Sequence, residues 1–102
     1  MIAQLPQPHQ FDDIVHGRVR LSVLAFLSAS RSAEFTLLKK TLQITDGNLA
    51  VHLRKLETAG YVGIKKDFVD RKPRSTIKIT AKGRKALAEY LEHMRSLMET
   101  LG

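Results

Sequence analysis

The sequence contains no cysteine and no tryptophan, and it has only 3 prolines among its 102 residues. The lack of cysteine excludes a disulfide framework, a thiolate zinc site and a cysteine nucleophile. The longest nearly apolar run, residues 21–27, is too short to cross a bilayer. Because residues 1–10 lack the basic and apolar regions of a secretory signal, we expect a soluble, cytoplasmic protein.

The net charge of +7 is concentrated in one part of the chain. Residues 61–85 carry nine Lys or Arg and two Asp, a net charge of +7, whereas the charges of the other residues sum to zero. Solubilising charge is normally spread out with both signs interspersed. A concentrated positive field instead favours a polyanion or an acidic surface as the partner.

Apolar spacing predicts one compact, mostly helical α+β domain, and the hydrophobic fraction of 43% suits a core of its own. After an irregular arm, a helical pattern begins at Phe11, with Ile14 and Val15 on its apolar side, and breaks at Gly17. The other expected elements are helices over 18–29, 37–42, 46–58 and 81–101, an extended piece over 33–35, and strands over 61–66 and 75–80 joined by a hairpin loop over 67–74. The expected helix signals are N-caps at Thr36, Thr45 and Thr80 and a left-handed stop at Gly60.

A short helix joined by a three-residue turn to a second helix is the helix-turn-helix arrangement, whose second helix enters the DNA major groove. Leu49, Leu53 and Leu56 share one face of the expected helix 46–58. The residues that we expect on DNA are Asn48, Val51 and Arg54 for groove readout, Gly47 and Ala50 for close approach, and Thr45 and Lys55 for phosphate contact. An ordinary amphipathic helix has a similar polar face, so this helix alone does not decide the function.

The expected hairpin adds a second signal, since its tip holds Arg71, Lys72 and Arg74 beside Lys65 and Lys66. We expect the three tip cations to contact phosphates or the minor groove. Charges also protect edge strands against aggregation, but that role does not require one sign only. The basic hairpin and the helix-turn-helix together favour a nucleic acid as the partner.

These elements resemble small winged helix-turn-helix transcriptional regulators, in particular the group intermediate between the MarR and ArsR families. The segments with this resemblance are Phe35–Leu42, Thr45–Leu49, His52–Val62, the basic wing Asp70–Arg74, and Ile79–Arg84. The resemblance covers residues 14–100 and implies a dimeric DNA-binding regulator. It places the recognition helix 46–58 in the major groove and the wing 67–74 on the backbone or in the minor groove.

The expected elements divide the chain into an irregular arm (1–10), a winged helix-turn-helix domain (11–80) and a C-terminal dimerisation helix (81–102). In the metal-sensing branch of these regulators, a cysteine pair on the recognition helix binds the metal. This chain has no cysteine, so metal sensing of that kind is excluded and we expect no cofactor.

The last helix has apolar residues at coiled-coil-like spacing, which favours a homodimer. The expected interface residues are Leu87, Tyr90, Leu91, Met94, Leu97, Met98 and Leu101, together with Phe11, Ile14 and Val15. A two-fold dimer places two recognition helices about 34 Å apart, so its operator is near-palindromic. The alternative is that this apolar stripe packs only on the chain's own first helices.

Other functions find less support in the sequence. His16 with Asp12, and His93 with Glu89, have the spacing of metal ligands on a helix, although a solvated helix face is the commoner reason for such pairs. The serines lie in no nucleophile-elbow context, and we expect no enzyme. The main rival is a winged-helix module that binds a protein or RNA through its basic hairpin. An unknown small-molecule effector at the dimer interface is also compatible with the sequence.

Overall fold

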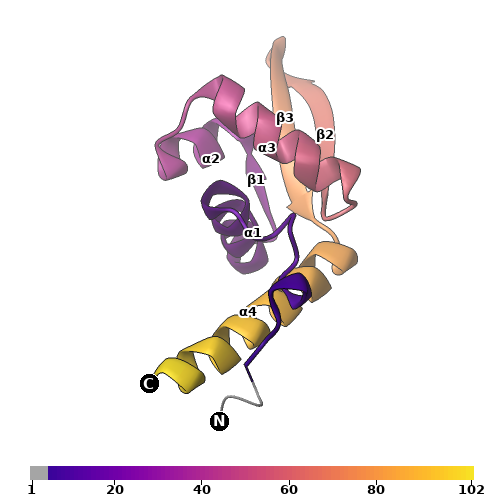
Figure 1. Cartoon of the computed structure of the whole chain (residues 1–102). Helices are drawn as coiled ribbons and strands as arrows, with labels where there is room; N and C mark the ends of the chain where they lie inside the picture. Colours follow the sequence, from indigo (N-terminus) through magenta and orange to yellow (C-terminus); the bar gives the residue numbers. More distant parts are fainter. Residues whose placement is uncertain (1–4) are drawn as a thin grey trace.

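The computed structural model describes residues 5–102, and over this range it has four α-helices and a three-stranded antiparallel sheet (Figure 1). The helices are α1 (Arg18–Ser30), α2 (Phe35–Leu42), α3 (Asp46–Thr58) and α4 (Ala81–Leu101), with a short 3-10 helix at Pro8–Gln10. The strands are β1 (Ser32–Glu34), β2 (Val62–Val69) and β3 (Lys72–Ile79), and β3 lies in the middle of the sheet. The α+β winged helix-turn-helix fold expected from the sequence is therefore confirmed.

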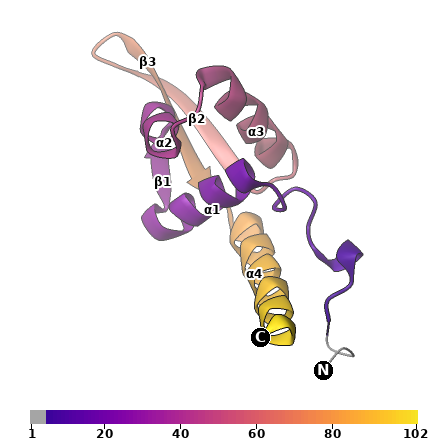
Figure 2. The ribbon, with the colours of Figure 1, turned by 60° about the vertical axis from the view of Figure 1, so that its left-hand side comes forward.

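The core lies between the sheet and the helices α1, α2 and α3, which pack on one face of it (Figure 2). Its fully buried side chains include Leu24 of α1, Leu38 of α2 and Ile77 of β3. Along β3, Ile77 and Ile79 are buried, whereas Lys78 between them is exposed. This alternation follows from the two-residue period of a strand and defines a core face and an outer face for the sheet.

The helix expected to begin at Phe11 does not form. Residues 11–17 make turns instead, and a short 3-10 helix lies within the arm that was expected to be irregular. The Asp12 carboxylate accepts hydrogen bonds from the backbone N–H groups of Ile14 (2.8 Å) and Val15 (3.1 Å). Asp side chains compete with a helix in this way, because they bond the nearby amides that a helix would use.

The helix-turn-helix follows the expectation closely, except at the start of α2. Helix α2 begins at Phe35 and its N-cap is Glu34, so Thr36 lies in its first turn and is not the cap. At α3, Thr45 accepts a hydrogen bond from the Asn48 amide (3.1 Å), which confirms the expected cap. Thr80 caps α4 in the same way, and Gly60 has a left-handed φ of 81°.

The β-hairpin is longer than the sequence predicted. Strands β2 and β3 pair from Val62↔Ile79 to Val69↔Lys72, so the expected eight-residue loop shrinks to Asp70 and Arg71. Both residues have positive φ angles, 51° and 68°, as in a two-residue turn matched to the twist of the strands. The wing is therefore a paired ribbon that projects from the body (Figure 2).

Helix α4 extends away from the rest of the molecule (Figures 1 and 2). Gly83, Ala86, Leu87 and Tyr90 in its first half are buried against the body, whereas Met98 and Leu101 near its end are 60% and 79% exposed. No helix within residues 5–102 combines the length and the apolar character needed to span a membrane.

Candidate nucleic-acid interface

Helix α3 and the β2–β3 hairpin lie at the same end of the molecule, opposite the C-terminal end of α4 (Figures 1 and 2). The buried face of α3 holds Leu49, Leu53 and Leu56, which are at most 3% exposed. Because one face of a helix is anchored in this way, the opposite face points outward. All seven residues expected to contact DNA from this region are exposed: Thr45, Gly47, Asn48, Ala50, Val51, Arg54 and Lys55.

The first turn of α3 combines a capped N-terminus with a balanced charge. Asp46 lies near the positive end of the helix dipole and is paired with Lys39 of α2 at 2.9 Å. The positive charge of Lys39 offsets the negative charge of Asp46, which would otherwise repel a phosphate. The polar donors near this end of α3 therefore face solvent without a net negative charge beside them.

Four of the expected DNA-contacting cations are free to bind an external anion. Within residues 5–102, Arg54 and Lys55 of α3 form no ion pair within 4.0 Å. The same is true of Arg71 and Lys72 at the end of the hairpin. All four side chains are exposed, so their positive charges are available to a polyanion.

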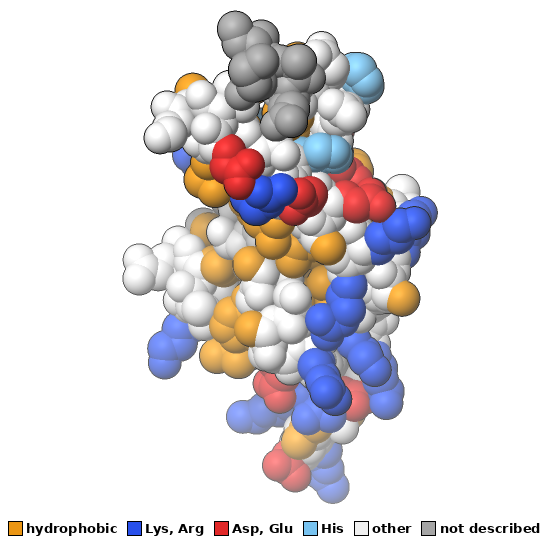
Figure 3. Space-filling view, turned by 90° about the horizontal axis from the view of Figure 1, so that it is seen from below, with side chains coloured by type: hydrophobic (Ala, Val, Ile, Leu, Met, Phe, Trp, Pro, Cys, Tyr) orange, Lys and Arg blue, Asp and Glu red, His pale blue; other side chains and the backbone are white. Residues whose placement is uncertain are grey.

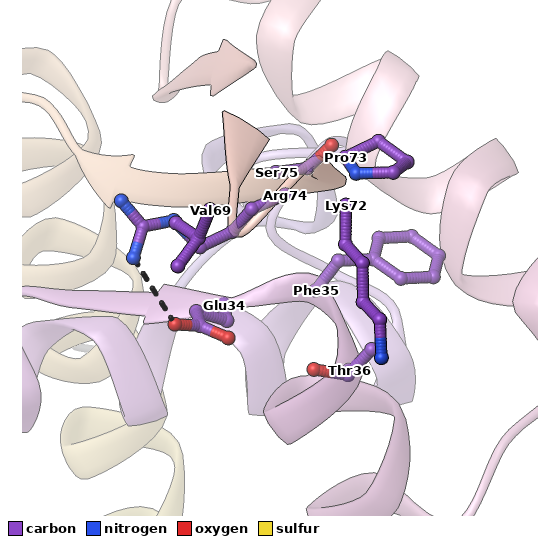
Figure 4. Close-up of a pocket in the computed structure, with 8 residues that line it drawn as sticks. All are labelled: Glu34, Phe35, Thr36, Val69, Lys72, Pro73, Arg74 and Ser75. Atoms are coloured by element: carbon purple, nitrogen blue, oxygen red, sulfur yellow. Dashed lines mark ion pairs between the residues drawn. The ribbon is translucent and has the colours of Figure 1, made fainter. Parts of the chain in front are cut away.

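Arg74 differs from its expected position and environment. It lies on β3, not at the tip, and its Nε and Nη2 donate to the Asp67 carboxylate at 3.1 and 3.0 Å. Its Nη1 is also 3.7 Å from Glu34 of β1, an ion pair drawn in Figure 4. The hydrogen bonds from Arg74 lower the pKa of the Asp67 carboxyl. The sequence placed Lys72 and Arg74 at the tip because basic residues beside a proline resemble a loop, and the strand register overturns that assignment.

A hollow separates α3 from the hairpin, and neither Lys66 nor Phe68 of β2 was among the residues expected to contact DNA. Lys66 lines this hollow together with Ala50 and Arg54 of α3. Phe68 follows on the same strand and is 74% exposed. The period of two from the buried Val62 places Lys66, the last residue of the expected strand 61–66, on the α3 side. Phe68 would have followed on the same side, had the strand been predicted to continue beyond residue 66.

The segment before α1 also reaches α3. Arg20 connects His52 of α3 to the backbone carbonyl of Ile14, at 3.0 and 2.6 Å respectively. Tyr61, just before β2, donates a hydrogen bond to Asp12. Burial and the bond to Asp12 raise the pKa of Tyr61 to about 12. These contacts fix the N-terminal turns against α3 and against the residue that precedes β2.

The residues expected at a dimer interface fall into two groups. Val15, Leu87 and Tyr90 are at most 5% exposed within the single chain, so these three side chains pack in its own core. Phe11, Ile14, Met94 and Leu97 are half-buried, whereas Leu91, Met98 and Leu101 are at least 50% exposed. Figure 3, viewed from the end at which α4 finishes, shows hydrophobic side chains gathered on this side of the molecule.

The spacing of His16 and Asp12 does not produce a metal site here. His16 Nδ1 lies 2.8 Å from the Tyr90 hydroxyl, whereas the Asp12 carboxylate is bonded to Tyr61 and to two backbone amides. Within residues 5–102 no three His, Asp or Glu side chains come close enough together to hold a metal ion.

Comparison with known proteins assigns the family. A protein of Methanocaldococcus jannaschii is 40% identical over 88 residues, covering 86% of this chain and 96% of that protein. The solved transcriptional regulator homologue from Pyrococcus horikoshii has a TM-score of 0.83 at 32% identity, over 98% of this chain and 95% of that one. The regulator BldR from Sulfolobus solfataricus has a similar fold, with a TM-score of 0.71 at 24% identity, over 91% of this chain and 69% of that one. Residues 19–98 match the model of the winged helix DNA-binding domain, and the chain belongs to this family.

Proposed function

We propose that the protein is a transcriptional regulator that binds duplex DNA as a homodimer, with α3 in the major groove and the wing on the backbone or in the minor groove. The observation that supports it most is that the outer face of α3 and the hairpin tip lie at one end of the molecule, with cations that form no ion pair to any residue of the described range 5–102. The similar protein from Pyrococcus horikoshii, described as a transcriptional regulator homologue, supports the same role.

Each contact residue has a role that follows from its chemistry. Asn48 and Arg54 donate hydrogen bonds to base edges, and Val51, which is 51% exposed, suits the methyl group of thymine. Arg71 at the tip binds phosphate or enters the minor groove. The residues proposed to assist them are Gly47 and Ala50 for close approach, and Thr45, Lys55 and Lys72 for phosphate contact.

The proposed dimer forms through the second half of α4. Leu91, Met98 and Leu101 leave an apolar stripe in solvent, and a second copy of α4 would cover it. A two-fold axis there would present both α3 helices to one side of a duplex, about one helical turn apart. The operator would then contain two related half-sites.

The test is selection of binding sites from random duplexes, followed by titration of the selected site at several salt concentrations. Contacts with six to eight phosphates should give a slope of about −5 to −7 in log K against log salt. Arg54→Ala should relax base preference at one position, whereas Arg71→Ala should weaken binding to all sequences alike. Absence of duplex binding at low salt, or a flat salt response, would overturn the proposal in favour of a protein partner. Preference for duplex RNA in competition would overturn it in favour of RNA.

A further inference from the structure

Phe68 is a large apolar side chain in an unusual position for an aromatic residue. It is the second-last residue of β2 and is 74% exposed, although the other aromatic residues of the described chain are at least half-buried or pack against the core. Its cross-strand partner is Pro73, which is also exposed. Directly opposed residues on one face of a hairpin are close neighbours, so the two form an exposed apolar pair beside the tip.

The register of the hairpin places this pair on the side of α3. Val62↔Ile79 and Ile64↔Ile77 are the pairs on the core face, and side chains two residues apart share a face. The same face therefore continues outward through Lys66↔Ser75 to Phe68↔Pro73. Figure 4 agrees with this placement, since Pro73 lies on the side of Phe35, away from the ion pair of Arg74 with Glu34.

The charges around the pair identify the kind of partner. Lys66 lies on the same face between the core and Phe68, and Arg71 lies at the tip beyond it. The Asp67 carboxylate is on the other face and is bonded to Arg74, and Glu34, which lines a hollow together with Pro73, is paired with the same guanidinium. Asp70 lies at the tip, and Glu57 of α3 lines the hollow beside Lys66. The pair therefore places an aromatic ring between two cations. It matches a nucleic-acid groove, in which apolar sugar and base edges lie between two rows of phosphates.

We propose that Phe68, supported by Pro73, is an apolar wedge that contacts the sugars and base edges of the DNA minor groove, while Lys66 and Arg71 bind the phosphates on either side. This inference rests on the proposed DNA-binding function. It adds Phe68, which lies outside the basic tip, to the residues that contact DNA. A wedge of this kind partly unstacks a base step and bends the duplex. Flexible pyrimidine–purine steps unstack most easily, so they should recur in selected sites at the position that the wing contacts.

The first test compares the salt dependence of three proteins on the selected duplex: the wild type, Phe68→Ala and Arg71→Ala. Loss of the apolar contact should weaken binding by about tenfold or more, as expected for a large apolar side chain that is buried on binding. The log–log salt slope should stay unchanged, because the ring releases no counterion. Arg71→Ala should instead reduce the magnitude of the slope by about 1. Phe68→Leu should retain most of the affinity, since it keeps an apolar side chain.

The second test uses the lack of tryptophan in the chain. Phe68→Trp introduces a single fluorescent indole at the wedge, and DNA should change its emission. The control is Ala88→Trp, which places an indole at an exposed position of α4, away from the hairpin, and its emission should not respond. Bending measured by energy transfer between the ends of the duplex should decrease for Phe68→Ala.

The outcomes separate this inference from the proposed function. If the wild type binds no duplex, both the proposed function and the proposed role of Phe68 are overturned. If the wild type binds duplex DNA, but Phe68→Ala binds within twofold of it and the emission of Phe68→Trp is unchanged by DNA, only the wedge is overturned. Loss of self-association by Phe68→Ala in sedimentation would also overturn it, because the ring would then belong to a contact between two copies of the chain.

Discussion

Arg20 of α1 joins His52 of α3 to Ile14 in the turns that precede α1. Its Nη1 lies 3.0 Å from Nδ1 of His52, and its Nε donates to the carbonyl oxygen of Ile14 at 2.6 Å. Because a guanidinium only donates hydrogen bonds, Nδ1 of His52 must accept, and the imidazole is therefore neutral in this arrangement. Burial lowers the pKa of His52 first, and the charges of Arg20 and Lys55 lower it further.

This arrangement predicts a pH dependence of stability. The pKa of His52 in the folded protein is below its ordinary value of 6.5, so near and below that pH the unfolded chain binds more protons than the folded one. The free energy of unfolding should therefore fall as the pH is lowered from 7 to 5. His52→Gln should reduce this dependence, since glutamine accepts a bond from Arg20 without titrating. Urea denaturation at both pH values measures the effect.

The matched control is His9→Gln, at an exposed position of the N-terminal arm. It should keep the pH dependence of the wild type. If His52→Gln shows the same difference between pH 7 and pH 5 as the wild type and His9→Gln, then His52 does not contribute to the loss of stability in acid.

The cross-strand bonds of Arg74 predict that Arg74 stabilises the wing, whereas Arg71 contributes more to DNA affinity. Arg74→Ala should lower the thermal unfolding temperature, because it removes two hydrogen bonds to Asp67 that hold the hairpin register. Its effect on DNA affinity should be smaller than that of Arg71→Ala, whose side chain is unpaired at the tip. Fluorescence anisotropy with labelled duplex compares the affinities. If Arg74→Ala remains folded but loses more DNA affinity than Arg71→Ala, this prediction is wrong.

The helix-turn-helix was predictable because its signals are local. Thr45 caps α3 through a bond to an amide three residues away, and the leucines of α3 repeat at the helical period. The presence of the hairpin was predictable from the sequence, but the lengths of its two strands were not. Pro73 and, more weakly, Lys72 disfavour a strand. The place of residues 72–74 in β3 depends on partners in β2 such as Asp67, which a sequence pattern does not specify.

The structure of residues 11–17 and the extent of burial along α4 were not predictable from apolar spacing. The residues from Phe11 onward have helical spacing, but the Asp12 side chain bonds the amides that a helix would need. The apolar positions of α4 were correctly placed on one stripe. Their division into a core part, such as Leu87, and an exposed part, such as Leu101, depends on where the body of the domain ends. That boundary is a property of the folded structure.

Two glycines predict opposite effects of the same substitution. A Cβ atom at Gly83 would lie 2.1 Å from the carbonyl oxygen of Tyr61, because the first turn of α4 packs directly on the backbone before β2. Gly83→Ala should therefore destabilise the protein by about 1–3 kcal/mol, as overpacking does, although alanine favours helices. Gly47→Ala meets nothing within 4 Å and should stabilise α3 by up to about 1 kcal/mol. Urea denaturation compares both variants, and equal effects would refute the close approach at Gly83.

The exposed stripe on α4 predicts the assembly state. Leu91→Glu combined with Met98→Glu should shift the protein from dimer to monomer, since each carboxylate would have to be desolvated in the interface. Both side chains are at least 50% exposed in the single chain, so the fold should persist and circular dichroism should be unchanged. Lys85→Glu places a carboxylate on the opposite face of α4, where it should leave the dimer intact. Sedimentation at micromolar concentration is the measurement, and a wild-type protein that sediments as a monomer would exclude this interface.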